Sequence, residues 1–215
     1  MQDLFGHSKI RIYTPEDWPK IWELFQLVAQ KGDVFAYDES TSEETAKYLW
    51  VLPPSQAYVA TIEEQFVGTY FIRPNQPGRG NHIANAGFMV HPQARNLKWG
   101  HRLLNHALVQ AKKDGYTGMQ FNFVVQSNHA ALRLWRSAEF QTIGIVPGAF
   151  RHAQLGLVDI AIMYRSLATI SLTQEKAEGT EKAEKAEKAE NGAGTERAER
   201  AEILEGDLGS MKDGS

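Results

Sequence analysis

The chain has 215 residues, of which 42% are hydrophobic, and its formal net charge is -3. A chain of this size and composition can bury one full hydrophobic core, so we expect a single globular domain. It contains no cysteine, which excludes disulfides, thiolate metal sites and a cysteine nucleophile.

Charge and hydropathy limit the classes of binding partner and the cellular location that we expect for this protein. The acidic excess falls in the last fifth of the chain, and the near-neutral remainder argues against general nucleic-acid binding, which needs a concentrated basic face. No apolar run has the length of a membrane span, and Met1-Gln2-Asp3-Leu4 lacks the start of a secretory signal. We therefore expect a cytoplasmic protein with no nucleic-acid or membrane partner.

The first third of the chain alternates strand-like and helix-like segments. Residues 9–13 alternate as in a strand, and residues 14–17 resemble a helix start with proline at the first helical position. Residues 42–45 indicate a second helix, which Pro53-Pro54 ends. The helix that follows residue 17 is predicted from apolar side chains at helical spacing, namely Trp18, Ile21, Trp22, Phe25 and Val28.

The middle of the chain predicts a meander followed by a helix. Residues 57–62 and 65–72 are expected to form a hairpin, and residues 82–90 its third strand. The next helix has one apolar face and ends at Gly115. That face consists of Leu103, Leu104, Ala107, Leu108 and Ala111.

The remaining elements complete an α+β pattern. Residues 120–125 form a strand that leads to a short helix after Asn128. Residues 141–146 and 158–164 are plausible final strands. We therefore predict a mixed sheet flanked by helices.

A polar, glycine-bearing turn at residues 95–100 connects the third strand of the meander to the helix after it. A turn of this kind at a helix N-terminus can hold a diphosphate, because backbone N–H groups and the helix dipole favour an anion. The turn has neither the Gly-Lys-Ser/Thr of a P-loop nor the Gly-x-Gly-x-x-Gly of a dinucleotide fold. It therefore predicts a phosphate-bearing ligand other than ATP or NAD.

Residues 168–215 differ in composition from the rest. Glu181-Lys182-Ala183 repeats as a triplet through Glu190 and returns in variant form at residues 196–202. The only apolar residues of the triplets are alanines, and a period of three makes no stripe on a helix. We expect a low-complexity, disordered, solvated tail, with an interaction tail as the alternative. Residues 1–167 are then the globular domain.

The turn and a later motif resemble those of the GNAT superfamily of acetyl-CoA-dependent N-acetyltransferases. The family turn, Gln/Arg-x-x-Gly-x-Gly/Ala, aligns on residues 95–100, where Arg95 and Gly100 match and Lys98 replaces the first glycine. The later signature, Asn-x-x-Ala with an aromatic and a Gly-Phe-like end, has Glu139 where glycine is usual. Its matching residues are Asn128, Ala131, Trp135 and Phe140.

This resemblance covers roughly residues 8–166 and implies the fold in more detail. The implied fold is a GNAT-like mixed, mostly antiparallel twisted sheet whose central strands splay apart, with flanking helices. It also implies acetyl-CoA as co-substrate and direct transfer of the acetyl group to an amine.

Several segments resemble more narrowly the proline-analogue acetyltransferases of yeasts, which acetylate azetidine-2-carboxylate and related cyclic secondary amino acids. This likeness implies a small-molecule amine as acceptor and a homodimer, and Lys98 looks like the subgroup's own variant of the turn. The segments are residues 68–75, 85–88, 121–128, 144–147 and 158–159.

The resemblance also implies where acetyl-CoA binds. Splayed strands expose backbone groups that can bond the pantetheine amides, and a backbone N–H near Phe88 and Met89 would polarise the thioester oxygen. Arg95 and Lys98 can add charge at the turn, whereas Arg102 is better explained as an ordinary cation. The predicted cofactor-binding residues are Met89, Val90, Arg95, Asn96, Leu97, Lys98, Trp99, Gly100, His101 and Asn128.

Three asparagines are the candidate polar groups. Asn85 and Asn122 would face the cleft from the two splayed strands and bind the substrate, with Asn122 also catalytic beside Phe88 and Met89. Amides donate and accept without carrying charge. Asn122 lies in an apolar strand, where a buried amide requires partners. Asn128 is equally a helix N-cap, and both roles can hold.

The sequence does not identify the groups that move protons. Trp135 occupies the position where many relatives have the tyrosine that protonates the leaving thiolate; its indole does not release a proton near neutral pH, so packing is its expected role. Water, Tyr70 or Tyr164 could replace it. His82 and Asp159 are base candidates by type only, and no histidine pair has metal-ligand spacing, so no metal is predicted.

Besides an interaction protein whose function lies in the charged tail, two other functions remain open at this stage. One is a GNAT enzyme that acts on a protein or peptide amine. The other is a non-catalytic acyl-CoA-binding module, which Lys98 and Trp135 favour and the asparagines oppose.

Overall fold

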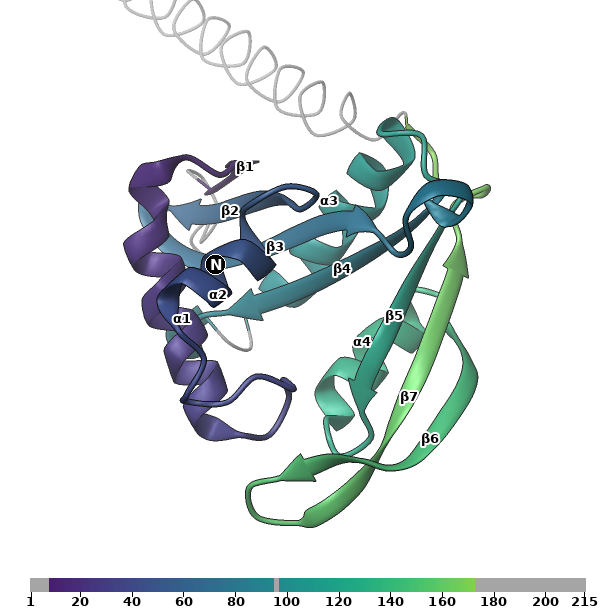
Figure 1. Ribbon diagram of the computed structural model, residues 1–215. Helices are drawn as coiled ribbons and strands as arrows, with labels where there is room; N and C mark the ends of the chain where they lie inside the picture. Colours follow the sequence, from purple (N-terminus) through teal and green to yellow (C-terminus); the bar gives the residue numbers. More distant parts are fainter. Residues whose placement is uncertain (1–7, 95–96, 173–215) are drawn as a thin grey trace, which may run out of the picture. The chain divides into compact units, whose positions relative to one another are not determined.

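The computed structural model describes residues 8–94 and 97–172. They form a seven-stranded sheet in the order β1-β2-β3-β4-β5-β7-β6 (Figure 1). The strands are β1 (Ser8–Ile12), β2 (Gln56–Ile62), β3 (Gln65–Pro74), β4 (Ile83–Val90), β5 (Gly118–Val125), β6 (Gln141–His152) and β7 (Gly156–Ser166). The helices are α1 (Trp18–Lys31), α2 (Glu43–Trp50), α3 (Trp99–Lys113) and α4 (His129–Ser137), with short 3-10 turns η1 (Pro15–Asp17), η2 (Gly78–Gly80) and η3 (Pro92–Ala94).

The predicted α+β fold is confirmed, because every predicted strand and helix is present and all strand pairs but one are antiparallel. Local signals set the helix starts: Pro15 opens η1 ahead of α1, and the Ser42 hydroxyl accepts from the Thr45 N–H to cap α2. The strand predicted to end at residue 146 is longer than expected. An irregularity between Val146 and Phe150 accommodates Pro147, and pairing with β7 then continues to His152.

The central strands separate, as the sequence resemblance implied. β4 and β5 are parallel and pair only where they begin, at Ile83 with Gly118 and Ala84 with Met119. Figure 1 shows the two strands diverging beyond this point. The side-chain Nδ2 of Asn85 donates to the carbonyl of Gln120 across 2.9 Å, so it bridges the strands where the backbone ladder stops.

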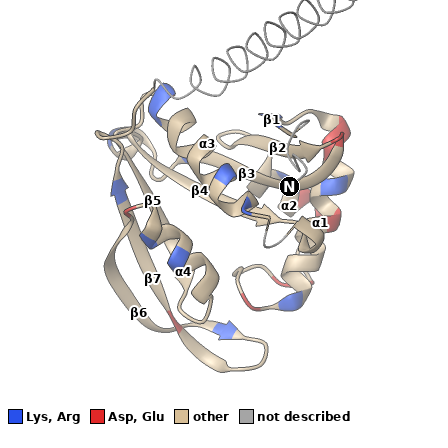
Figure 2. Ribbon diagram, turned by 180° about the vertical axis from the view of Figure 1, so that it is seen from behind, with Lys and Arg blue, Asp and Glu red and all other residues tan. Residues whose placement is uncertain are grey.

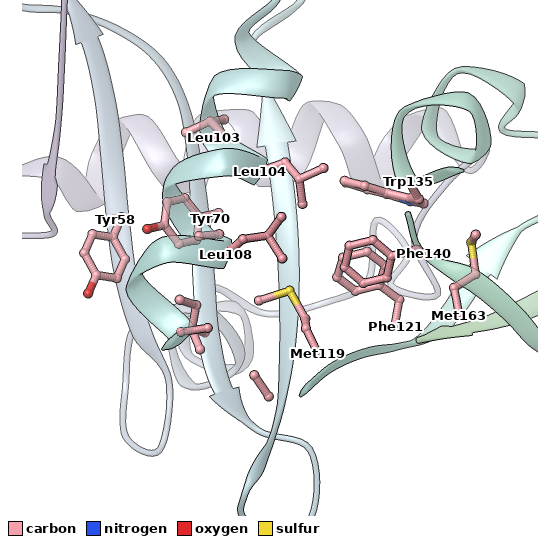
Figure 3. Close-up of a cluster of buried hydrophobic side chains, with 14 of the residues drawn as sticks. Tyr58, Tyr70, Leu103, Leu104, Leu108, Met119, Phe121, Trp135, Phe140 and Met163 are labelled. Carbon is pink, nitrogen blue, oxygen red and sulfur yellow. The ribbon is translucent and has the colours of Figure 1, made fainter. Parts of the chain in front are cut away.

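Hydrophobic clusters cover both faces of the sheet. On one face α1 and α2 pack on β2, β3 and β4, where Phe71 and Met89 are buried. On the other face α3 and α4 cover a cluster that includes Tyr70, Phe121 and Trp135 (Figure 3). Consecutive residues of β3 thus serve opposite faces, as the strand period of two requires.

The domain continues past the last strand. Leu167 is fully buried in the cluster under α3, and Ile170 packs against the same cluster. The sequence placed the domain boundary at residue 167, and these contacts show that a truncation should keep Ile170. The predicted tail from residue 173 on lies outside the described residues.

Candidate active site

Three adjoining cavities follow the gap between β4 and β5. The turn cavity has a volume of about 550 Å³ and lies between the end of β4, the first turn of α3 and α4. The splay cavity, of about 150 Å³, lies between the diverging strands and α4. The amide cavity, of about 190 Å³, is formed by β3, β4, β5, α2 and the segment after α1.

Shared wall residues place the three cavities side by side along one path between the strands. Phe88, Asn128 and Trp135 line both the turn cavity and the splay cavity, whereas Phe35 and Gly87 line both the splay cavity and the amide cavity. A ligand held at the start of α3 can therefore extend between the strands toward the amide cavity.

The turn cavity contains most of the predicted cofactor-binding residues. Its lining includes the β4 residues Phe88, Met89 and Val90 and the α4 N-cap Asn128. It also includes the α3 N-cap Lys98 and the first three residues of α3, Trp99, Gly100 and His101. The side chain of Leu97 is 38% exposed and does not line this cavity. Arg95 and Asn96 lie outside the described residues.

The backbone at Lys98 explains why glycine is usual at this position of the motif. Lys98 has φ +59° and ψ +14°, which is the left-handed region. A residue with a Cβ atom destabilises the fold by about 1 kcal/mol in this conformation. Lysine at this position also adds a cation to the wall of the cavity. Gly100 is close to α4, since a Cβ atom on it would lie 3.1 Å from Cδ2 of Leu134.

The charges around the turn cavity suit a diphosphate. Neither α3 nor α4 contains Asp or Glu (Figure 2), and the positive end of the α3 dipole faces the cavity. Lys98, Lys31 and Asp33 line it, and Lys31 Nζ lies 2.5 Å from Asp33 Oδ2, so Lys98 is the lysine of the wall that has no acidic partner among the described residues. Arg102 was expected to be an ordinary exposed cation. It is instead half-buried, donates to Ser8 Oγ and has its guanidinium carbon 4.7 Å from the centroid of the Trp99 ring.

The register of β4 decides which backbone groups face the gap. The bonds from Asn75 N–H to the Ile83 carbonyl and from His91 N–H to the Val67 carbonyl mark both ends of the β3–β4 ladder. The alternation of an antiparallel ladder turns the intervening N–H of Met89 toward β3 and that of Phe88 toward the gap. Of the two predicted oxyanion donors, Phe88 has the suitable orientation.

Asn128 has one of the two roles that the sequence left open, that of a helix N-cap. Its Oδ1 accepts from the Ala131 N–H at 3.1 Å and caps α4. The residue also lines both the turn cavity and the splay cavity. The cap fixes the side chain at the junction of these cavities.

Asn85 and Asn122 line the amide cavity together. Asn122 was expected to be buried in an apolar strand, and that expectation is wrong, because its side chain is exposed. A bulge in β5 between Phe121 and Val124 explains the difference. It interrupts the alternation and presents Asn122 and Phe123 to the same cavity.

Hydrogen bonds hold the two amides in place. Asn122 Oδ1 accepts from Gln120 Nε2 at 2.8 Å, and Asn122 Nδ2 donates to Asn75 Oδ1 at 2.7 Å. Because Asn85 uses its Nδ2 on the Gln120 carbonyl, its Oδ1 is the atom that can accept from a ligand N–H.

Sequence reasoning missed other residues of the amide cavity. Tyr37 comes from the segment after α1, and Arg73 lies on β3 directly opposite Asn85. The apolar wall contains Phe35, Trp50, Phe71 and Phe123. The alternation of β3 and β4 could have placed Arg73 and Asn85 on one face, but nothing in the sequence of residues 32–41 indicates that they line a site.

The candidate proton-transfer residues lie away from these cavities. Tyr70 is fully buried, its hydroxyl pairs with His106 Nδ1 at 2.6 Å, and burial raises its pKa far above the usual value. Tyr70, Tyr164, His82 and Asp159 line none of the three cavities. Trp135 packs against Phe121 and other aromatic rings, the role predicted for it (Figure 3).

Two further properties hold for the described ranges 8–94 and 97–172. These residues contain no group of three or more His, Asp or Glu side chains that could hold a metal ion. None of their helices is long and apolar enough to cross a membrane.

Residues 18–140 match the model of the acetyltransferase (GNAT) family. A curated relative is the N-acetyltransferase aca1 of Schizosaccharomyces pombe, which is 39% identical over 85 residues, or 40% of this chain. The match spans only 41% of aca1.

Solved structures with the same fold support this match. A GCN5-related N-acetyltransferase from Kribbella flavida is 36% identical and has a TM-score of 0.71, with 74% of this chain and 97% of that chain covered. The acetyltransferase yncA of Salmonella typhimurium, solved with its cofactor acetyl-CoA, has a TM-score of 0.65. It is 18% identical, with 76% of this chain and 96% of that chain covered.

Proposed function

This chain belongs to the acetyltransferase (GNAT) family, and we propose that it transfers an acetyl group from acetyl-CoA directly to the amine of a small amino acid. The favoured acceptors are cyclic secondary amino acids such as azetidine-2-carboxylate. The observation that carries the proposal is the amide cavity, in which Asn85 and Asn122 lie within apolar walls at the end of the path from the α3 turn. A homodimer and a cytoplasmic location remain predictions from the sequence.

The turn cavity fits the donor. Acetyl-CoA supplies a thioester whose carbonyl an amine can attack. In the proposed arrangement, the backbone at the start of α3 and Lys98 hold the diphosphate. Backbone groups of β4 bind the pantetheine, and the Phe88 N–H stabilises negative charge on the thioester oxygen.

The amide cavity suits a compact amine. Its volume of about 190 Å³ and its aromatic walls favour a small ring over an extended peptide. Asn85 Oδ1 can accept from the amine N–H and orient its lone pair toward the splay cavity, where the acetyl group would arrive. A carboxylate at the position of Asn85 would stabilise the protonated, unreactive ammonium form of the acceptor. The amide of Asn85 carries no charge and therefore does not have this effect.

An acceptor panel tests the proposal. Release of free CoA thiol is measured with azetidine-2-carboxylate, proline analogues, primary amines and basic peptides at equal concentrations. We expect turnover of the cyclic amino acids and little turnover of the peptides. Acetylation of peptides alone would contradict the small-molecule acceptor, while binding of acetyl-CoA without turnover of any amine would favour a non-catalytic module.

The two amides should differ in importance. Asn85→Ala removes the bridge to Gln120 and the predicted amine contact, so kcat/KM for the acceptor should fall by an amount worth about 3 kcal/mol. Asn122→Ala should cost only about 1 kcal/mol, because this exposed side chain leaves partners that water can satisfy. The acetyl-CoA Kd of both variants, measured by calorimetry, should remain at the wild-type value. Equal turnover of Asn85→Ala and wild type would contradict the assigned role.

A further inference from the structure

Arg73 gives the amide cavity its charge. Among the described residues that line this cavity, Arg73 is the single charged side chain, and the remainder are apolar, aromatic, tyrosine or asparagine. No Asp or Glu of the described chain forms a salt bridge with it. A cation inside a small, largely apolar cavity favours an anionic group on the ligand.

The sheet holds this guanidinium in a defined place. Arg73 and Asn85 are direct cross-strand partners on β3 and β4, and Phe71 and Gly87 are the next pair on the same face. The guanidinium carbon of Arg73 lies 5.0 Å from the centroid of the Phe71 ring, in stacking contact.

Gly87 makes room for this stack. A Cβ atom at Gly87 would lie 2.5 Å from Cε1 of Phe71, so the ring can occupy its position only because residue 87 has no side chain. The Phe71 ring, seated over Gly87, therefore supports the Arg73 guanidinium on the face of the sheet that also carries Asn85. A freely mobile surface arginine would have no such support.

We infer that Arg73 binds the carboxylate of the acceptor and is the residue that selects amino acids over simple amines. The inference rests on the proposed function and deepens it. The planar guanidinium can hold a carboxylate through two N–H donors, while Asn85 Oδ1 accepts from the amine of the same molecule. Because Arg73 and Asn85 are direct cross-strand partners, both can contact one small ligand, and in an α-amino acid the carboxylate and the amine are bonded to the same carbon.

The test compares acceptors that differ only in the recognised group. kcat/KM is measured for azetidine-2-carboxylate and for its carboxamide, with wild type, Arg73→Gln and Arg73→Lys. Wild type should prefer the free acid by about 10- to 100-fold, as expected for a hydrogen-bonded charge pair. Arg73→Gln should lose this preference, with turnover of the carboxamide changed by less than about threefold. Arg73→Lys should keep part of the preference, because it keeps the charge without the planar fork.

The controls separate the inference from the function on which it rests. Arg79→Gln removes an exposed arginine that follows β3 and does not line the amide cavity, so it should leave the preference unchanged. The acetyl-CoA Kd and the melting temperature of each variant check that the domain is folded. Wild type that turns over both acceptors equally, or Arg73→Gln that keeps the preference for the acid, overturns the role of Arg73 and leaves the acetyltransferase assignment intact. Failure of wild type to acetylate any amino acid overturns the proposed function, and the inference with it.

Discussion

Gly100→Glu should abolish acetyl-CoA binding, with a Kd raised by more than about 100-fold. A Cβ atom at this position would lie 3.1 Å from Leu134 Cδ2, and the longer side chain would extend into the turn cavity. Its carboxylate would meet the predicted diphosphate at the start of α3, so steric and electrostatic effects act in the same direction. Calorimetric titration with acetyl-CoA measures the loss.

A matched variant isolates the effect of position. Gly144→Glu makes the same change of charge on β6, where an added Cβ atom would have only ordinary contact, 3.8 Å from Ile162 Cδ1, outside the three cavities. It should bind acetyl-CoA as wild type does. Gly100→Ala should lose only part of the affinity, because it adds bulk without charge. If Gly100→Glu melts at the wild-type temperature and still binds acetyl-CoA with wild-type affinity, the turn is not part of the cofactor site.

Periodicity was sufficient to predict the elements that place this site. The apolar spacing of residues 103–111 predicted α3, whereas it was the family resemblance that implied the separation of β4 and β5, which stop pairing after Ala84. The departure at Lys98 could be seen in the sequence, but its cause could not. A left-handed φ is a backbone property, and it shows why this position usually holds glycine.

The acceptor side depends on contacts between distant segments, and the sequence alone does not specify them. Strict alternation would place Asn122 and Phe123 on opposite faces of β5, whereas the bulge opposite β7 turns both toward the amide cavity. Arg73 gains its significance from its register with Asn85 and from the space above Gly87. Tyr37 lines the amide cavity from an irregular segment, and such a segment has no hydrophobic periodicity from which its role could be predicted.

The pH dependence of turnover should follow the acceptor and not the enzyme. Among the described residues lining the amide and splay cavities there is no Asp, Glu or His to act as a base. Burial raises the pKa of Tyr58 to about 12 and that of Tyr70 further, so both stay neutral near physiological pH. The amine must therefore lose its proton before it can attack, and kcat/KM should rise about tenfold per pH unit below the amine pKa.

Two acceptors with different amine pKa values make this expectation decisive. Their kcat/KM profiles, measured between about pH 6 and pH 9, should be displaced along the pH axis by the difference between the two amine pKa values. The Kd for acetyl-CoA is measured over the same pH range as a control. It should change far less than kcat/KM, because acetyl-CoA binding does not involve the acceptor amine. A plateau beginning at one common pH for both acceptors would show instead that a group on the enzyme controls the proton. In that case the base would have to act from outside the amide and splay cavities, and Asp33 and His101 on the wall of the turn cavity would be the first residues to replace.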